Sequence, residues 1–195
     1  MYLYLVRHAQ SQGNVLRTFH GHTDYPLTPL GREQARRVGE KLRAAAFSRC
    51  AASDLARAWE TALSCVEGRG ITPEPTRALR EQYMGALEGL TWEQAEERYP
   101  GFREAYVEDW FHTVPPGGES PRAMAARAAA WTEEVLRRGE DTLAVAHNGT
   151  LGLIMLHLKL VEETELLRPE WDFVQGSYTA IRVAGGKAAL EGFNL

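Results

Sequence analysis

The chain has 195 residues, of which 44% are hydrophobic and 25% charged, and its formal net charge at pH 7 is -4. This length and composition are typical of one globular domain with a sizeable core, so we expect residues 1–195 to form a single domain. The net negative charge argues against a nucleic-acid-binding or anionic-membrane surface, which needs a basic excess on one face. No apolar stretch approaches the roughly 20 residues that span a bilayer. Neither nucleic acid nor a membrane is therefore an expected partner.

The cysteine content predicts a reducing environment. Cys50 and Cys65 are the only two cysteines, and both lie in apolar surroundings. The apolar run at the start of the sequence is five residues long and strand-like, unlike a secretory signal. We therefore expect a cytoplasmic protein in which both thiols are free.

Strand and helix signals alternate along the first third of the chain. An apolar strand at 2–6 is followed by Thr28-Pro29, an N-cap with proline at the first helical position, and by a helix predicted from Leu30 to Ala45. A short buried strand is predicted at 50–53, and a helix from about Asp54 to Glu67.

The middle of the chain is less regular. Thr91-Trp92-Glu93-Gln94 has capping-box spacing and predicts a short helix that ends at Pro100. The least regular segment is Gly101 to Gly118, which predicts a long loop. We expect a lid or specificity insert at about 91–118.

The last third returns to regular elements. Ser120-Pro121 starts an Ala-rich helix that reaches about Arg138 and leads into a strand at 142–146. Two closing segments, 178–183 and 188–193, are separated by two glycines and predict an antiparallel hairpin. The expected fold is α/β, a three-layer sandwich with a mostly parallel central sheet flanked by helices.

Two of the predicted strands end in histidine. Arg7-His8 directly follows the first strand, and His147 follows the strand at 142–146. Because ligands of open α/β sheets bind beyond the carboxyl ends of the strands, these side chains are expected at one edge of the sheet. Either histidine alone is more often a structural residue, but two imidazoles at one edge suggest a shared site.

Five blocks of residues form a recognisable set of motifs along the chain. They are Arg7-His8 through Asn14; Gly21 through Thr28 with Gly31 and Gln34-Ala35; Ser53-Asp54-Leu55-Ala56-Arg57-Ala58 with Thr61-Ala62; Leu79-Arg80-Glu81 with Gly85 and Glu88-Gly89-Leu90; and Val145-Ala146-His147-Asn148-Gly149. Through these blocks the chain resembles the histidine phosphatase superfamily, the phosphoglycerate-mutase-like proteins, over nearly its whole length. Any one of the matching motifs is weak, whereas five in the same order and at compatible spacing are hard to obtain by chance.

The resemblance implies a reaction in two steps. His8 is the implied nucleophile and forms a phosphohistidine, since a neutral imidazole is nucleophilic and its other ring nitrogen can donate to a backbone carbonyl. Glu81 is the implied proton donor for the leaving group and the base in the second step, and Glu88 is the alternative.

The resemblance also implies a phosphate-binding set. Guanidinium groups offset the charge of a phosphoryl group through bidentate hydrogen bonds, and the resemblance implies this role for Arg7 and Arg57. An arginine in the first turn of a helix is nevertheless usually a solvated surface residue. The implied phosphate- and substrate-binding residues are Arg7, Asn14, His20, Gly21, Arg57, His147 and Asn148. Relatives often carry glycine and an acidic residue where this chain has Ala9 and Gln10.

The family contains phosphatases and cofactor-dependent phosphoglycerate mutases. The run from Tyr106 to Pro116 contains no arginine, whereas the mutases carry extra basic residues near this insert to bind a carboxylate and a second phosphate. A pocket lined by Trp110 and Phe111 suits a less acidic leaving group. We therefore predict a phosphoric monoester hydrolase for a small phosphorylated metabolite, with a phosphoglycerate mutase as the alternative.

Two other functions stay possible interpretations of the sequence, a metal-dependent hydrolase and a non-catalytic phosphate-binding module. His20, His22 and Asp24 have the His-x-His-x-Asp spacing of some metallohydrolases, although Tyr25 stands where those enzymes have another histidine. A phosphate-binding module without catalysis would retain the pocket, but such proteins tend to lose the nucleophile or the acid. The favoured reading needs no metal and no cofactor. A homodimer is the default assembly, because homodimers are the commonest oligomers.

Overall fold

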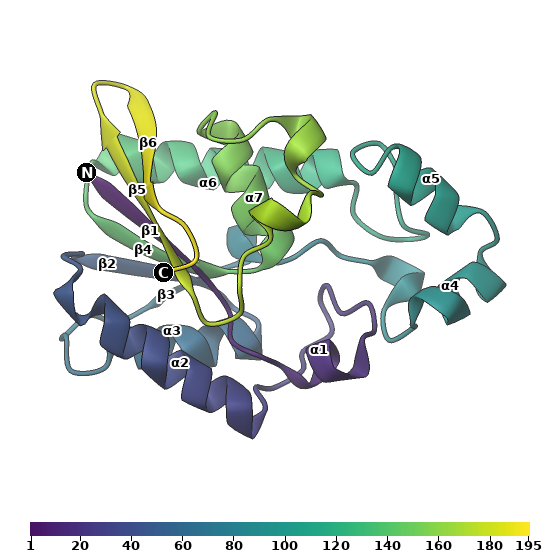
Figure 1. Ribbon diagram of the computed structural model, residues 1–195, viewed down its shortest axis with the longest axis horizontal. Helices are drawn as coiled ribbons and strands as arrows, with labels where there is room; N and C mark the ends of the chain where they lie inside the picture. Colours follow the sequence, from purple (N-terminus) through teal and green to yellow (C-terminus); the bar gives the residue numbers. More distant parts are fainter.

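The structure is a computed structural model that describes residues 1–195, and its centre is one six-stranded sheet with the strand order β3-β2-β4-β1-β5-β6. Four strands run parallel, and β5 and β6 form an antiparallel hairpin at one edge (Figure 1). The strands are β1 (Tyr2–Arg7), β2 (Arg49–Ser53), β3 (Glu74–Thr76), β4 (Thr142–Ala146), β5 (Tyr178–Ala184) and β6 (Lys187–Gly192).

Two pairs of long helices cover the two faces of the sheet. Figure 1 shows α2 (Pro29–Lys41) and α3 (Ala56–Val66) on one side and α6 (Pro121–Arg138) and α7 (Asn148–His157) on the other. The start of α2 follows from the local sequence, because the Thr28 hydroxyl accepts the Gly31 N–H at 3.0 Å and Pro29 lacks an N–H to satisfy.

The core lies in two layers, one on each face of the sheet. Successive side chains of a strand point to opposite faces, so Leu3 and Leu5 pack with the α6 and α7 side, and Tyr4 and Val6 with the α2 and α3 side. Strands β1 and β4 are buried on both faces, as expected for the centre of a parallel sheet.

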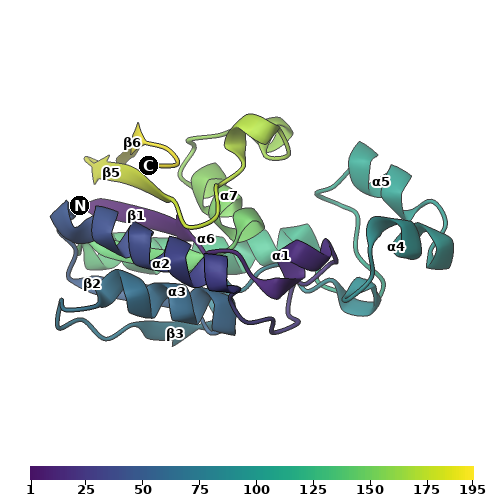
Figure 2. The same cartoon turned by 60° about the horizontal axis from the view of Figure 1, so that its bottom comes forward.

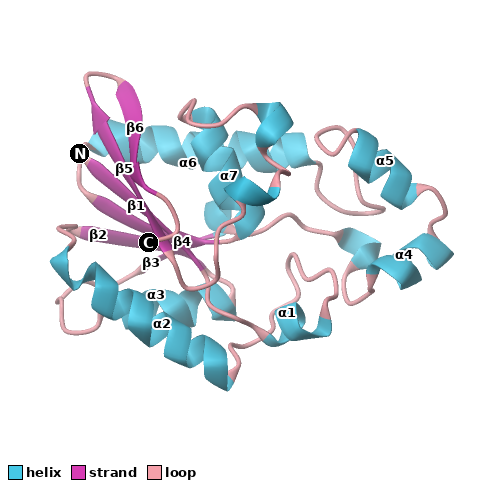
Figure 3. Cartoon of the chain, in the orientation of Figure 1, coloured by secondary structure: helices cyan, strands magenta, loops and turns pink.

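The remaining helices extend beyond the carboxyl ends of the parallel strands. Figures 2 and 3 show α1 (Gln12–Leu16) close to the sheet, with α4 (Trp92–Arg98) and α5 (Phe102–Glu108) further out. Phe19 packs against this outer part, with 4.6 Å between the centroids of its ring and that of Trp92 in α4. Five short 3-10 turns complete the chain: η1 (Leu42–Ala44), η2 (Arg77–Leu79), η3 (Gly85–Leu87), η4 (Glu163–Glu165) and η5 (Pro169–Trp171).

The predicted fold class is confirmed, and so are the helices and strands on which it rested. Four elements differ from expectation. The sequence analysis missed α1, β3 and α7, and the segment expected to be a long loop contains α5. None of the helices is long and apolar enough to cross a membrane. Both cysteines are free and buried, as expected.

Candidate active site

The carboxyl ends of the parallel strands assemble the site. Arg7 ends β1, His147 follows β4 directly, and Arg57 lies in the first turn of the helix that follows β2. Glu81 comes shortly after η2, the turn that follows β3. Four strands that are not all adjacent in sequence therefore deliver these side chains to one edge of the sheet.

A cavity of about 310 Å³ lies at this edge. The nucleophile, the favoured acid and the phosphate- and substrate-binding residues that the resemblance implies all line it, including those for which a turn or a surface role was the simpler interpretation. They are Arg7, His8, Asn14, His20, Gly21, Arg57, Glu81, His147 and Asn148.

The polarity of this cavity is suited to an anion. Only four buried side-chain nitrogen or oxygen atoms of the chain have no hydrogen-bond partner: Arg7 Nε, Thr18 Oγ1, Arg57 Nε and His147 Nδ1. All four belong to residues that line the cavity. An unpaired buried polar group costs about 1–3 kcal/mol, so four such groups in one place indicate a ligand that pairs with them.

Arg57 is buried, with only 1% of its surface exposed, in contrast to an ordinary arginine at the start of a helix. Its Nη1 donates to the Thr23 carbonyl at 3.0 Å, and its Nη2 donates to the carbonyls of His20 and Gly21 at 2.9 and 2.8 Å. Burial lowers the pKa of this guanidinium to about 10. Arg57 therefore holds the loop at residues 20–23 while its Nε stays unpaired.

Arg7 is the second cation of the cavity. Its Nη1 donates to the Phe173 carbonyl, which ties the guanidinium to the segment that follows η5. Burial lowers the pKa of Arg7, and the carboxylates of Glu81 and Asp172 act in the opposite direction. In both arginines the contacts with the protein use Nη atoms and Nε has no partner, so both retain N–H groups for a ligand.

His8 is oriented by its own backbone segment. Its Nδ1 lies 2.7 Å from the Ala9 carbonyl, an acceptor, so Nδ1 carries the proton and Nε2 keeps its lone pair. Burial, Arg57 and Arg7 hold the pKa of His8 well below its ordinary value. The ring is therefore neutral at physiological pH, with Nε2 available as a nucleophile.

His147 lies beside His8, with 5.0 Å between the ring centroids. Its Nε2 lies 2.9 Å from the Ser53 hydroxyl. Burial, followed by Arg57 and His8, holds the pKa of His147 well below its ordinary value. The site thus contains two neutral imidazoles as well as two guanidinium groups.

The loop after α1 contributes His20 and Asn14. His20 Nδ1 donates to the Thr18 carbonyl at 2.6 Å, so its Nε2 is an acceptor for the Asn14 amide at 3.3 Å. The Asn14 carbonyl accepts the Ser11 N–H at 2.9 Å. Gly21 is required by close packing, because a Cβ there would lie 1.7 Å from the Gln82 carbonyl oxygen.

The structure distinguishes the two candidate acids. Glu81 lines the cavity, and its carboxylate accepts the Gly149 N–H at 3.1 Å at the start of α7. Glu88 does not line the cavity. Its carboxylate accepts the backbone N–H groups of His22 and Thr23 and so supports the loop. The position of Glu81 is the one suited to proton transfer in the cavity.

Asn148 has a structural connection as well as its place in the cavity. Its amide donates to Asp172 at 2.9 Å, and its carbonyl accepts the Phe173 N–H at 2.9 Å. The start of α7 is therefore bound to the segment that follows η5.

The His-x-His-x-Asp spacing does not form a metal-binding cluster. His20 pairs with Asn14 and Thr18, the His22 Nε2 lies 3.0 Å from the Glu81 carbonyl, and the Asp24 carboxylate accepts the Ala56 N–H at 2.7 Å. No group of three or more His, Cys, Asp or Glu side chains is arranged to hold a metal ion.

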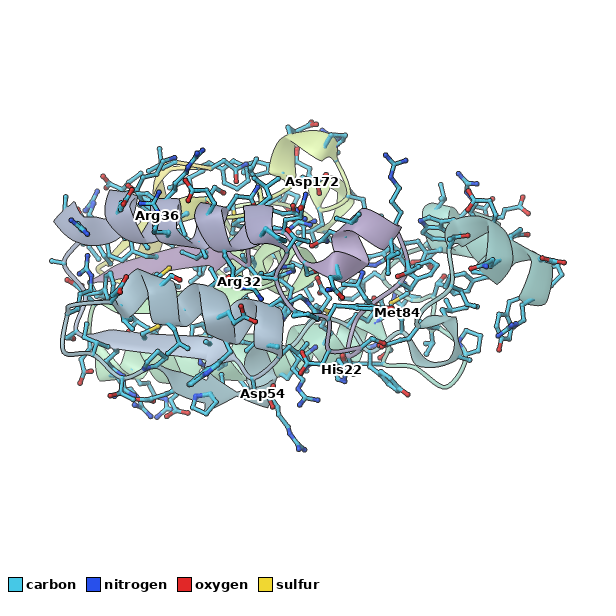
Figure 4. All side chains as sticks on the ribbon, turned by 90° about the horizontal axis from the view of Figure 1, so that it is seen from below. His22, Arg32, Arg36, Asp54, Met84 and Asp172 are labelled. Atoms are coloured by element: carbon cyan, nitrogen blue, oxygen red, sulfur yellow. The ribbon has the colours of Figure 1, made fainter.

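The outer wall of the cavity combines two segments. Trp110 lines it as predicted, together with Tyr106 of α5, but the prediction for Phe111 was wrong, because that ring packs on the core instead. Sequence reasoning did not assign the other lining residues to the site, and only Gly149 among them belongs to a motif block: Thr18, Phe19, Gln82, Met84, Met124, Gly149, Gly152, Leu166, Leu167, Trp171 and Asp172. Met84, which precedes η3, and Asp172, which follows η5, are labelled in Figure 4 and lie in different segments of the chain.

Comparison with known families decides the identity of the fold. The model of the histidine phosphatase superfamily (branch 1) matches residues 3–195. The chain belongs to this superfamily. Among curated members, it is 33% identical over 203 residues to the adenosylcobalamin/alpha-ribazole phosphatase of Salmonella typhimurium, covering 100% of this chain and 96% of the relative.

The similar superfamily members include both phosphatases and mutases. The crystal structure of the alpha-ribazole phosphatase from Shigella flexneri superposes with a TM-score of 0.92 at 27% identity, covering 100% of this chain and 96% of that one. A 2,3-bisphosphoglycerate-dependent phosphoglycerate mutase of Gloeobacter violaceus is 32% identical over 181 residues, which is 88% of this chain and 81% of the mutase. The predictions of this family and of a phosphoric monoester hydrolase are confirmed.

Proposed function

We propose that the protein hydrolyses the phosphate monoester of a small metabolite through a phosphohistidine at His8, without a metal ion. The observation that carries the proposal is the cavity itself. All four buried side-chain polar atoms without a partner, two of them on arginines, belong to its lining, beside a neutral imidazole with a free Nε2.

In the first step, His8 Nε2 attacks phosphorus. The N–P bond forms, and the bond between phosphorus and the ester oxygen breaks. Glu81 transfers its proton to that oxygen, and the alcohol leaves. Arg7 and Arg57 offset the charge of the phosphoryl oxygens, and their donors are already in place before the reaction.

In the second step, a water molecule attacks the phosphohistidine. The Glu81 carboxylate accepts a proton from this water, the N–P bond breaks, and inorganic phosphate leaves. One carboxyl group can serve both steps because it is returned to the protonated state. The hydrogen bond that Gly149 N–H donates to Glu81 holds the carboxylate in place between the two steps.

The charge of the outer wall favours a neutral leaving group. Arg7 and Arg57 are the lining residues with a permanent positive charge, and both serve the phosphoryl group. The acidic lining side chains are Glu81, which carries its proton before the first step, and Asp172, whose carboxylate would repel a second anion. This disfavours a phosphoglycerate and therefore the mutase alternative. Apolar rings such as Trp110 and Trp171 suit an alcohol with apolar surface.

The similarity to alpha-ribazole phosphatases makes alpha-ribazole phosphate the first substrate to test. We also propose that the segment at about 91–118 is the specificity insert, since it supplies Tyr106 and Trp110. A reducing compartment and a homodimer stay predictions from the sequence.

The first experiment measures phosphate release from p-nitrophenyl phosphate in excess EDTA. Activity that survives EDTA and falls at least a thousandfold in His8→Ala supports the proposal. Loss of activity in EDTA, or retention in His8→Ala, would contradict it. A wild-type protein that binds phosphate but hydrolyses neither p-nitrophenyl phosphate nor alpha-ribazole phosphate would instead be a binding module.

The role of Glu81 is tested by the leaving group. Because p-nitrophenolate leaves without protonation, Glu81→Gln should lower kcat/KM much more for an alkyl phosphate than for p-nitrophenyl phosphate. Glu88→Gln is the matched control, since Glu88 lies outside the cavity. Equal losses for both substrates in Glu81→Gln, or the selective loss in Glu88→Gln, would refute the assignment.

A further inference from the structure

Ser53 contacts the active site from behind. It is the last residue of β2, and none of its surface is exposed. Its hydroxyl lies 2.9 Å from His147 Nε2, while the other ring nitrogen, Nδ1, is buried and has no partner in the protein. Ser53 does not line the cavity itself. Any effect on the reaction must therefore pass through the histidine.

The direction of the Ser53 to His147 hydrogen bond follows from proton accounting. A serine hydroxyl has one proton to donate and two lone pairs. The Leu55 N–H approaches one lone pair at 3.4 Å, and His147 Nε2 is the only acceptor that lies within hydrogen-bond distance of the hydroxyl. If Nε2 were protonated instead, the Ser53 proton would be buried without an acceptor, which is costly. The hydroxyl therefore donates to Nε2.

We propose that Ser53 is a positioning residue that holds His147 in the tautomer with its proton on Nδ1, so that the ring presents a donor to the phosphoryl group. The inference rests on the proposed function for the identity of the ligand. A neutral imidazole has one donor and one acceptor nitrogen, so occupation of Nε2 by a donor leaves the proton on Nδ1. With the other tautomer, a lone pair would face the phosphoryl oxygens and repel them.

The two histidines of the site then have complementary roles. His8 donates from Nδ1 to the Ala9 carbonyl and keeps a lone pair on Nε2 for attack. His147 accepts at Nε2 from Ser53 and keeps the proton on Nδ1 for the developing charge. Both rings are Nδ1–H tautomers, yet each offers the opposite kind of atom to a ligand. A separate backbone or side-chain partner determines each orientation.

The tautomer can be measured without catalysis. We would record ¹⁵N chemical shifts of the imidazole nitrogens in protein labelled at its six histidines, and assign His147 from the His147→Asn variant. The expected spectrum of the wild type has a protonated Nδ1 and an unprotonated Nε2 at His147. In Ser53→Ala, this preference should be lost while His8 keeps its shifts. A wild-type His147 protonated at Nε2 would overturn the proposal, whatever the enzyme hydrolyses.

Kinetics provide the second readout. Ser53→Ala should lower kcat for p-nitrophenyl phosphate about 10-fold, the equivalent of one hydrogen bond, with KM changed less than about threefold. Ser53→Thr, which retains the hydroxyl, should restore both the tautomer and kcat. Thr132→Val is the matched control, since it removes a buried hydroxyl of α6 that donates to the Ala128 carbonyl outside the cavity. A Ser53→Ala enzyme with the wild-type kcat, or a loss no larger than that of Thr132→Val, would contradict the positioning role.

Discussion

Replacement of Arg57 by lysine tests two roles that the structure gives to one side chain. The substitution retains the positive charge but replaces a planar fork by a single nitrogen. In the wild type, Nη1 and Nη2 together donate to the carbonyls of His20, Gly21 and Thr23, and Nε is left for the phosphoryl group. One ammonium cannot occupy both Nη positions and also face the cavity.

The expected magnitudes follow from this geometry. Loss of one or two of the three charged hydrogen bonds, at about 1.5–3 kcal/mol each, should lower the free energy of unfolding by about 2–5 kcal/mol. That is a large share of the roughly 5–15 kcal/mol that stabilises a typical domain. Loss of a fixed donor to the transferred phosphoryl group should lower kcat/KM about 100- to 1,000-fold.

The assay combines denaturant unfolding with kcat/KM for p-nitrophenyl phosphate. The kinetics are measured under conditions in which wild type and variants are folded. Arg69→Lys is the matched control, because the Arg69 guanidinium also donates to two backbone carbonyls, those of Leu42 and Ala45, but lies outside the cavity. We expect Arg69→Lys to lose stability and to retain kcat/KM within about threefold.

Two results would refute the reasoning about Arg57. An Arg57→Lys protein as stable as the wild type would show that the three carbonyl contacts do not hold the loop at residues 20–23. A stability loss without a change in kcat/KM beyond that of Arg69→Lys would show that the guanidinium does not serve the phosphoryl group.

Three further predictions concern groups whose surroundings are equally well defined. The lowered pKa of His8 means that the unfolded chain binds a proton near pH 6.5 that the folded chain rejects. His8 should therefore contribute up to about 1.4 kcal/mol per pH unit to the fall in the free energy of unfolding as the pH decreases from 7 to 5.5, and the slope should be smaller in His8→Gln. Gly149→Ala places a Cβ 2.6 Å from Glu81 Oε1, and should lower kcat/KM about 100-fold at nearly unchanged stability because the carboxylate can move away; unchanged kcat/KM would contradict this. Cys50 and Cys65 should resist Ellman's reagent until unfolding, since burial raises the pKa of both thiols, that of Cys50 to about 12, and rapid labelling of the native protein would refute this.

Local signals in the sequence were enough for most of the fold. Thr28-Pro29 predicts the start of α2 because the cap and the proline act within one turn. The two glycines at 185–186 predict the β5 and β6 hairpin because both adopt the positive φ angles, 57° and 74°, that the turn requires. The elements that were missed lack such signals. Strand β3 has three residues and α1 has five, and α7 is apolar on several sides because it is largely buried, so none of the three shows a clear period.

The sequence predicted which residues form the site better than it predicted how they are arranged. Arg7, His8 and His147 follow strands, and the motif blocks added Arg57 and Glu81, so all of them could be placed at the sheet edge beforehand. The resemblance favoured Glu81 over Glu88, although the two glutamates lie seven residues apart in one irregular segment and no local pattern distinguishes them. Packing gives the physical reason, because it directs Glu81 into the cavity and Glu88 to the loop backbone.

The amino-acid sequence by itself determined the α/β class, the two histidines at the ends of parallel strands and the phosphatase family, because periodicity, capping and motif order act over short distances along the chain. The tertiary structure alone decided which buried donors stay unpaired and which tautomer His147 adopts. Those properties depend on partners far away in sequence, such as Ser53 for His147, which lie 94 residues apart. A hydrogen-bond partner of that kind leaves no local pattern, since only the folded sheet brings the two strand ends together.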